Sequence, residues 1–177
     1  MKALWQLALA ATALGSVAVS DARTAAAQQT APIWTQTTNQ NWLLEAPNDT
    51  ERWRRLQFVF RGTDIPMWEV AYRYEMVYEA LAFANYDMAV YQWEKIREAV
   101  RGAVLKRPNR RPNAEAMFLD TTWDAVAREF KTKDAAKAWS GFELARSSCM
   151  ACHEAEKLGF MNQQALFERT ASPPKAR

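Results

Sequence analysis

Four segments between Thr63 and Gly159 carry apolar residues at the three- and four-residue spacing of an amphipathic helix. They run from Thr63 or Asp64 to about Ala84, from after Asn85 to about Lys106, from about Asn113 to Lys131, and from near Asp134 to a point before Gly159. Two of the three links are short, and short links make consecutive helices antiparallel neighbours. No segment shows a convincing two-residue alternation of the kind that marks a strand. The pattern predicts an all-α fold, an antiparallel four-helix bundle.

A signal peptide is predicted for residues 1–27. Lys2 gives a positive start, and Ala3 to Val19 is a nearly uncharged run rich in Ala and Leu. A permanent membrane anchor is the alternative, but the run is at the short end of the roughly 17–25 residues that a spanning helix needs. Ala25-Ala26-Ala27 offers a cleavage site, with Ala18-Val19-Ser20 as an earlier competitor, so the mature chain is expected to begin near Gln28. These features predict a periplasmic protein with no stable membrane span after processing.

After cleavage, residues 28–62 are expected to form a partly irregular N-terminal arm, and residues 63–177 a single helical domain with a C-terminal tail. The later part of the arm is either a short helix or an extended segment. The formal charge of +3 is too near neutral for a nucleic-acid partner, which would select a strongly basic face. Eight Trp, eight Phe and five Tyr predict an aromatic interior, whose rings either wall a flat cofactor or form ordinary core.

The two cysteines and the one histidine of the chain lie within five consecutive positions, Cys149-Met150-Ala151-Cys152-His153. This is the C-x-x-C-H pattern of covalent haem attachment. Two thiols three residues apart on a helix can each add to a haem vinyl group, and the imidazole of His153 then lies under the iron as the proximal ligand. A zinc site would need further Cys or His ligands, which the sequence lacks, and a thioredoxin-like motif would need a βαβ context. The motif therefore predicts one covalent haem c on the last helix.

The place of this motif near the end of the chain makes the protein resemble the class II c-type cytochromes, the cytochrome c′ group and its low-spin relatives. The small class I fold attaches haem near its N-terminus, whereas only residues 154–177 follow His153 here. Lys157, four residues after His153, matches the basic residue that class II proteins often carry. The segment from Met67-Trp68-Glu69-Val70 to Asn85-Tyr86 also resembles a less characterised group of exported helical haem proteins. The resemblance implies a protein that exchanges single electrons with redox partner proteins.

The sixth iron ligand decides between an electron carrier and a gas-binding protein. Because the chain has no second histidine, a methionine or a vacant position remains. In the low-spin class II relatives the ligand comes from the first helix, which points to Met67 and Met76. Met67 falls on the apolar face of that helix and Met76 lies nearly opposite, so Met67 is the preferred candidate. Both could equally be packing residues beside five-coordinate iron. Weaker candidates lie elsewhere: Met88, Met117 and Met161.

Two alternatives to a free electron carrier stay open. Five-coordinate iron would bind small gases such as nitric oxide or carbon monoxide, or the chain is a haem subunit docked on a larger oxidoreductase through the aromatic segment Ile33 to Phe60. An enzymatic role is not expected, because no free histidine remains for acid–base chemistry and no free thiol for nucleophilic attack.

Two basic features have both a functional and an ordinary interpretation. Arg73 either reaches a haem propionate or forms an ion pair on the first helix. The link from Lys106 to Arg111 either steers an acidic redox partner or is a solvated loop.

The C-terminal tail is expected to fold back over the bundle. Asn162, Gln163 and Gln164 follow the haem helix, and Phe160 and Phe167 are the predicted anchors. Class II relatives often form homodimers through their first two helices, and exposed rings at Trp68 or Trp93 would permit a homodimer here.

Overall fold

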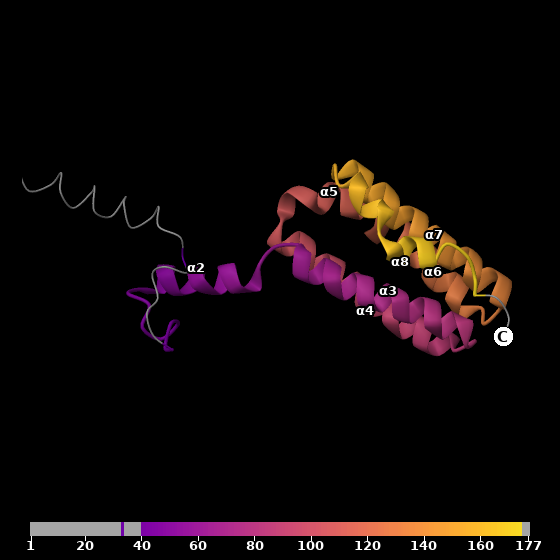
Figure 1. Ribbon diagram of the computed structural model, residues 1–177, viewed down its shortest axis with the longest axis horizontal. Coiled ribbons are helices and arrows are strands. Elements are labelled where there is room, and N and C mark those ends of the chain that lie inside the picture. Colours follow the sequence, from indigo (N-terminus) through magenta and orange to yellow (C-terminus); the bar gives the residue numbers. More distant parts are fainter. Residues whose placement is uncertain (1–32, 34–39, 175–177) are drawn as a thin grey trace, which may run out of the picture. The chain divides into compact units, whose positions relative to one another are not determined.

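The computed structural model describes residue 33 and residues 40–174, and all regular secondary structure in them is helical (Figure 1). The described chain divides into two compact units, one up to Val59 and one from Phe60 onward. The predicted signal peptide, residues 1–27, and its cleavage sites lie outside the described residues. Among the described helices, none is long and apolar enough to cross a membrane.

The first unit is built around α2 (Asp49–Phe60). The side chain of Asn48 caps this helix by accepting a hydrogen bond of 2.8 Å from the backbone N–H of Glu51. Arg55 is buried, where it pairs with the Glu51 carboxylate at 2.9 Å and donates to the carbonyl oxygen of Trp42. The later part of the N-terminal arm is therefore a short helix, which settles the choice that the sequence left open.

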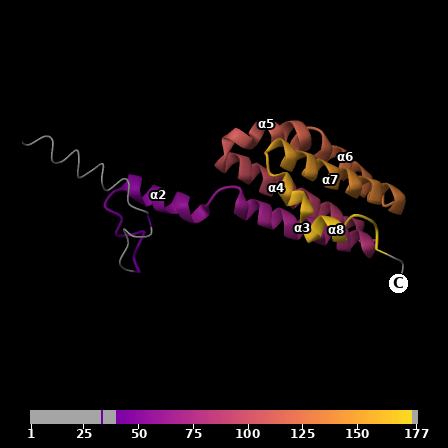
Figure 2. The ribbon, with the colours of Figure 1, turned by 45° about the horizontal axis from the view of Figure 1, so that its top comes forward.

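The second unit contains four longer helices and several short ones (Figures 1 and 2). The longer helices are α3 (Asp64–Ala82), α4 (Tyr86–Lys106), α6 (Thr122–Lys131) and α7 (Ala135–Ala155). Between and after them lie η2 (Pro108–Arg110), α5 (Arg111–Ala114), η3 (Glu115–Leu119), η4 (Gly159–Gln163) and α8 (Ala165–Arg169). The pairs α3 with α4 and α6 with α7 are helical hairpins, and α4 packs on α6.

The predicted starts of α4 and α7 are confirmed by their caps. The Asn85 side chain accepts from the N–H of Met88 at 3.1 Å, and the Asp134 side chain accepts from the N–H of Lys137 at 2.9 Å. Each cap satisfies one of the backbone donors that a helix leaves free in its first turn.

One aromatic core joins these helices, as the composition predicts. Its buried members include Tyr74 and Val77 from α3, Trp93 and Ile96 from α4, Phe118 from η3, Val126 and Phe130 from α6, and Phe142 from α7. Tyr74 stacks on Phe142 with ring centroids 4.7 Å apart, which ties α3 to α7.

Trp93 is 1% exposed, so the prediction that this ring lies on the surface is wrong. Its indole N–H donates to the backbone carbonyl of Trp123 at 3.0 Å, and the indole N–H of Trp123 donates back to the carbonyl of Trp93 at 3.2 Å. Because each ring satisfies its polar atom on the other residue's backbone, two Trp side chains can be buried between α4 and α6 without an unpaired donor. Trp68 is 74% exposed, so of the two rings it alone remains available to the predicted homodimer.

Trp93→Phe is expected to lower the free energy of unfolding by about 2–3 kcal/mol, because it deletes a buried hydrogen bond and leaves a void. The exposed Trp68→Phe is the control and is expected to change stability by less than about 0.5 kcal/mol. Denaturant unfolding followed by circular dichroism measures both. Equal effects of the two changes would contradict a special role for the Trp93 and Trp123 pair.

The third predicted helix, from Asn113 to Lys131, is not continuous. It is interrupted by the π-helical turn η3 and by a break at Asp120 and Thr121. The Asp120 N–H bonds to the carbonyl of Glu115 at 3.1 Å, five residues back, and the carbonyl of Met117 accepts from the Thr122 hydroxyl at 2.9 Å instead. Threonine hydroxyls compete with the backbone ladder in this way. The same carbonyl accepts from Ser148 of α7 at 2.5 Å, so the break fastens η3 to the helix that carries the C-x-x-C-H motif.

A non-glycine residue in the left-handed region lies two residues after the end of α3 and of α7: Ala84 with φ of 52° and Lys157 with φ of 61°. At Ala84 the N–H bonds to the carbonyl of Leu81 at 3.0 Å, and the next N–H, of Asn85, bonds to that of Ala80 at 2.7 Å. This is the Schellman arrangement, in which glycine is preferred because it has no Cβ. Helix α7 ends before Gly159, as predicted, and the left-handed residue that follows the helix is Lys157, two residues before that glycine.

Ala84→Gly is expected to raise the free energy of unfolding by about 0.5–1 kcal/mol, because the left-handed backbone strains alanine and not glycine. The matched control is Ala82→Gly, at the last residue of α3, where the backbone is still helical and glycine is expected to destabilise by up to about 1 kcal/mol. Thermal unfolding of the two variants therefore shifts in opposite directions. Two shifts of the same sign would contradict the strain at Ala84.

Candidate functional site

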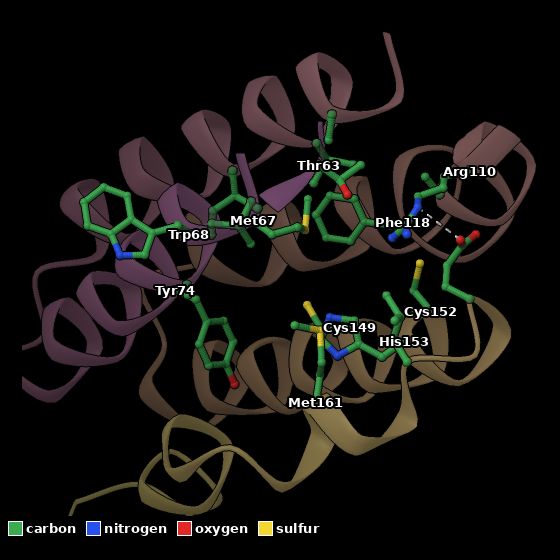
Figure 3. A pocket seen from close by; sticks show the side chains of 18 of the residues that line it. Thr63, Met67, Trp68, Tyr74, Arg110, Phe118, Cys149, Cys152, His153 and Met161 are labelled. Atoms are coloured by element: carbon green, nitrogen blue, oxygen red, sulfur yellow. Dashed lines mark ion pairs between the residues drawn. The ribbon is translucent and has the colours of Figure 1, made fainter. Parts of the chain in front are cut away.

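A cavity of about 450 Å³ lies within the second unit, between α3 and α4 on one side and α7 with the C-terminal tail on the other (Figure 3). Its volume is in the roughly 300–1,000 Å³ range of ligand and cofactor pockets. The walls are mostly apolar and are formed by residues such as Val70, Ile96, Val100, Ala103, Phe118 and Leu166. The cavity is large enough and apolar enough for a flat organic cofactor.

The C-x-x-C-H motif faces this cavity from α7. Cys149, Cys152 and His153 all line it, because positions three and four apart on a helix share one face. Both cysteines are half-buried free thiols. Burial, with a smaller contribution from the neighbouring Cys152, raises the pKa of Cys149 to about 12. Burial and the nearby Glu156 carboxylate also raise the pKa of Cys152. Both thiols are therefore neutral near pH 7 and need no counter-charge in an apolar cavity.

His153 is held by two residues from the C-terminal tail. Its Nδ1 atom lies 2.9 Å from Oδ1 of Asn162, and its ring packs edge-to-face against Phe167 with centroids 5.9 Å apart. Asn162 also bonds to α7 through the carbonyl of Met150. The tail therefore forms one side of the site, and sequence reasoning found Asn162 without finding its contact with His153.

The tail folds back as predicted, but with one anchor and not two. Phe167 is buried against Tyr74 and His153, whereas Phe160 is 68% exposed. After the tight turn that follows α7, η4 contributes Met161 and α8 contributes Leu166 and Phe167 to the lining of the cavity, whereas Phe160 is not part of the described lining. Thr170 and Ser172 complete the attachment through hydrogen bonds with Tyr74 and Tyr78.

One end of the cavity carries charge. Arg110 lines it and pairs with Glu156 at 3.5 Å (Figure 3). Asn113 donates to the same carboxylate at 2.7 Å. Sequence reasoning treated Arg110 only as part of the basic link, since nothing in the local pattern indicates that η2 turns it inward. Arg73 is absent from the described lining and pairs with Glu69 at 2.8 Å, so its interpretation as an ion-paired residue is confirmed.

The methionine candidates separate clearly. Met67 from α3 and Met161 from η4 line the cavity, and the described lining omits Met76, Met88 and Met117. Figure 3 shows Met67 on the wall opposite His153, whereas Met161 lies beside His153 on the same wall. Of the two methionines in the lining, Met67 is therefore the one that lies across the cavity from His153.

Comparison of the chain with protein-family models, with curated proteins and with solved structures finds no match. The site must therefore be interpreted from its own chemistry. Two thiols and an imidazole with an adjacent acceptor share one apolar cavity, with a guanidinium at one end and a thioether across it. This donor set fits covalently attached haem, which needs two thiols, one axial nitrogen and an apolar enclosure.

Proposed function

We propose that this protein is an exported c-type cytochrome that carries a single covalent haem and passes one electron at a time. The observation that carries the proposal is that Cys149, Cys152 and His153 converge on one apolar cavity large enough for the cofactor. The proposed architecture is the antiparallel four-helix bundle of the cytochrome c′ type, in which α3, α4, the broken third helix and α7 are the four members. The shared core and the two helical hairpins support it.

The cysteines would form the covalent attachment. Each thiol would hold the haem as a thioether to one of its vinyl groups, an addition of S–H to C=C that needs no oxidant and releases nothing. His153 would supply the proximal nitrogen and Met67 the sixth ligand from the opposite wall. Bound haem would supply a one-electron iron couple whose potential a methionine ligand raises.

The remaining wall residues would set the environment of the iron. Buried rings in the lining, such as Phe118 and Tyr74, would keep water from the iron and so limit the change in its surroundings between the two oxidation states. At the charged end of the cavity, Arg110 would pair with a haem propionate and neutralise its charge, either in place of Glu156 or in addition to it. The protein would carry out no substrate chemistry of its own, and its partners would be redox proteins.

Export is part of the same proposal. Residues 1–27 would be removed as a signal peptide, and the thioether bonds would form outside the cytoplasm, in the periplasm. An exported chain that keeps its two thiols unpaired with each other is consistent with thiols reserved for a cofactor.

The test is to express the full chain with a functioning haem-ligation system and to measure the intact mass and visible spectrum of the purified product. The expected result is a red protein, shortened at its N-terminus, whose mass includes one haem that survives denaturation. A colourless protein of polypeptide mass would overturn the proposal. A haem protein that is high-spin and binds carbon monoxide as purified would instead assign it to gas binding, and a chain that is stable only with another subunit would assign it to a larger oxidoreductase.

A further inference from the structure

The orientation of the Asn162 amide is determined by groups that can only accept hydrogen bonds. Its Nδ2 atom donates to the carbonyl of Met150 at 3.1 Å and to the carboxylate of Glu154 at 2.9 Å. Both acceptors lack a hydrogen, so the amide nitrogen has to face them. The amide oxygen therefore faces Nδ1 of His153, at 2.9 Å.

This orientation decides where the imidazole carries its hydrogen. An amide oxygen can only accept, so Nδ1 of His153 must be the donor. A neutral imidazole has one N–H, and Nε2 is therefore left with a free lone pair. The edge-to-face contact with Phe167 limits rotation of the ring. The polypeptide thus presents His153 in the form that a metal ion requires.

The carboxylate of Glu154 extends this arrangement by one residue. It accepts from the same amide group whose oxygen faces His153, and hydrogen bonds in a chain polarise one another. The space it occupies is provided by Gly159, where a Cβ atom would overlap the carboxylate of Glu154. A negative charge behind Asn162 makes the amide oxygen a stronger acceptor. The chain thus contains a relay from Glu154 through Asn162 to His153.

We propose that Asn162, backed by Glu154, is the positioning residue of the proximal histidine, setting its tautomer and orientation and strengthening it as an electron donor to iron. The role rests on the proposed function, because the group it acts on is the haem ligand. A histidine whose Nδ1–H is donated to a good acceptor is a more basic ligand, which stabilises the oxidised metal. The relay therefore lowers the reduction potential relative to a protein without it.

The test compares three variants with the wild type in the full, processed chain. Asn162→Leu removes the acceptor and is expected to raise the reduction potential. Asn162→Asp puts a charged acceptor in the same place and is expected to lower it, whereas Glu154→Gln keeps the hydrogen bond but removes the charge and is expected to raise it by less than Asn162→Leu. Gln163→Leu, at the adjacent exposed amide, is the control and is expected to leave the potential unchanged.

A second measurement does not depend on electron transfer. Solvent exchange of the His153 Nδ1 hydrogen, followed by nuclear magnetic resonance, is expected to be about fivefold faster in Asn162→Leu than in the wild type. Potentials that shift in the same direction in Asn162→Leu and Asn162→Asp would indicate a merely structural role and overturn the proposal. So would a wild-type Nδ1 hydrogen that exchanges as fast as in Asn162→Leu. Absence of haem from the wild type overturns the proposed function instead, while the exchange measurement on that same chain still decides whether the hydrogen bond exists.

Discussion

The double variant Cys149→Ser/Cys152→Ser is expected to lose all covalently bound haem. A serine hydroxyl is close to a thiol in size, so the helix and the cavity are kept, but it does not add to a vinyl group as sulfur does. Haem staining of a denaturing gel and the intact mass of the purified chain measure the result. The expected loss is complete, because both attachment points lie on α7 and the chain has no other cysteine.

The single variants Cys149→Ser and Cys152→Ser are each expected to hold haem through one remaining thioether, at a lower yield. Ser147→Ala, an exposed change on the same helix, is the matched control and is expected to leave the yield unchanged. Haem that stays attached to the denatured double variant would contradict the proposed linkage. If the Ser147→Ala control also loses haem, the loss results from disturbing α7 and not from removing the thiols, which would contradict the thioether interpretation.

The helices whose pattern is strongest were predictable from the sequence. The bounds of α3, α4 and α7 follow from apolar periodicity together with the local capping residues Asn85 and Asp134. These signals lie within a few residues of the feature they specify, so no knowledge of the folded chain is needed. The break at Asp120 and Thr121 is different, because the carbonyl of Met117 that it releases is satisfied partly by Ser148, 31 residues away.

The site also has one part that the local sequence specifies and another part that depends on distant residues. Cys149, Cys152 and His153 form a local motif on one helical face, and the sequence alone brings them together. The opposite wall of the cavity comes from α3, α4 and η3, and the charged end comes from η2. Which residues form these two parts depends on how the helices pack. Arg110 was missed for this reason. The Asn162 contact with His153 also depends on packing, because it requires the tight turn at Lys157 that returns the tail to the cavity.

Trp93 shows which part of the packing the spacing specifies. It lies four residues after Ala89 and three before Ile96, on the buried face of α4, so its burial was predictable from spacing, whereas the partner of its indole N–H was not. A Trp that is buried on such a face still needs a partner for its polar atom. The carbonyl of Trp123, 30 residues away, is that partner. A pattern of single residues carries no record of such a reciprocal pair.

Met67→Leu is expected to convert the iron from six-coordinate to five-coordinate. Leucine fills a similar volume but offers no sulfur, so the wall opposite His153 loses its ligand and keeps its shape. The oxidised protein should then lose the charge-transfer band of methionine-ligated iron, become high-spin and bind carbon monoxide when reduced. Its potential should fall by on the order of 0.1 V, within the roughly 0.8 V range that axial ligands control.

Two other methionines serve as controls for this change: Met76, which is outside the described lining of the cavity, and Met161, which lies on the same wall as His153. Met76→Leu is on α3 but outside the described lining of the cavity, and it is expected to leave the spectrum unchanged. Met161→Leu lines the cavity beside His153, so it is expected to alter packing without removing a ligand. If Met161→Leu produces high-spin iron and Met67→Leu does not, then Met161 is the sixth ligand and the assignment of that role to Met67 is wrong. If neither does, the wild-type iron is five-coordinate, and the thioether of Met67 only fills space above a vacant position where small gases bind.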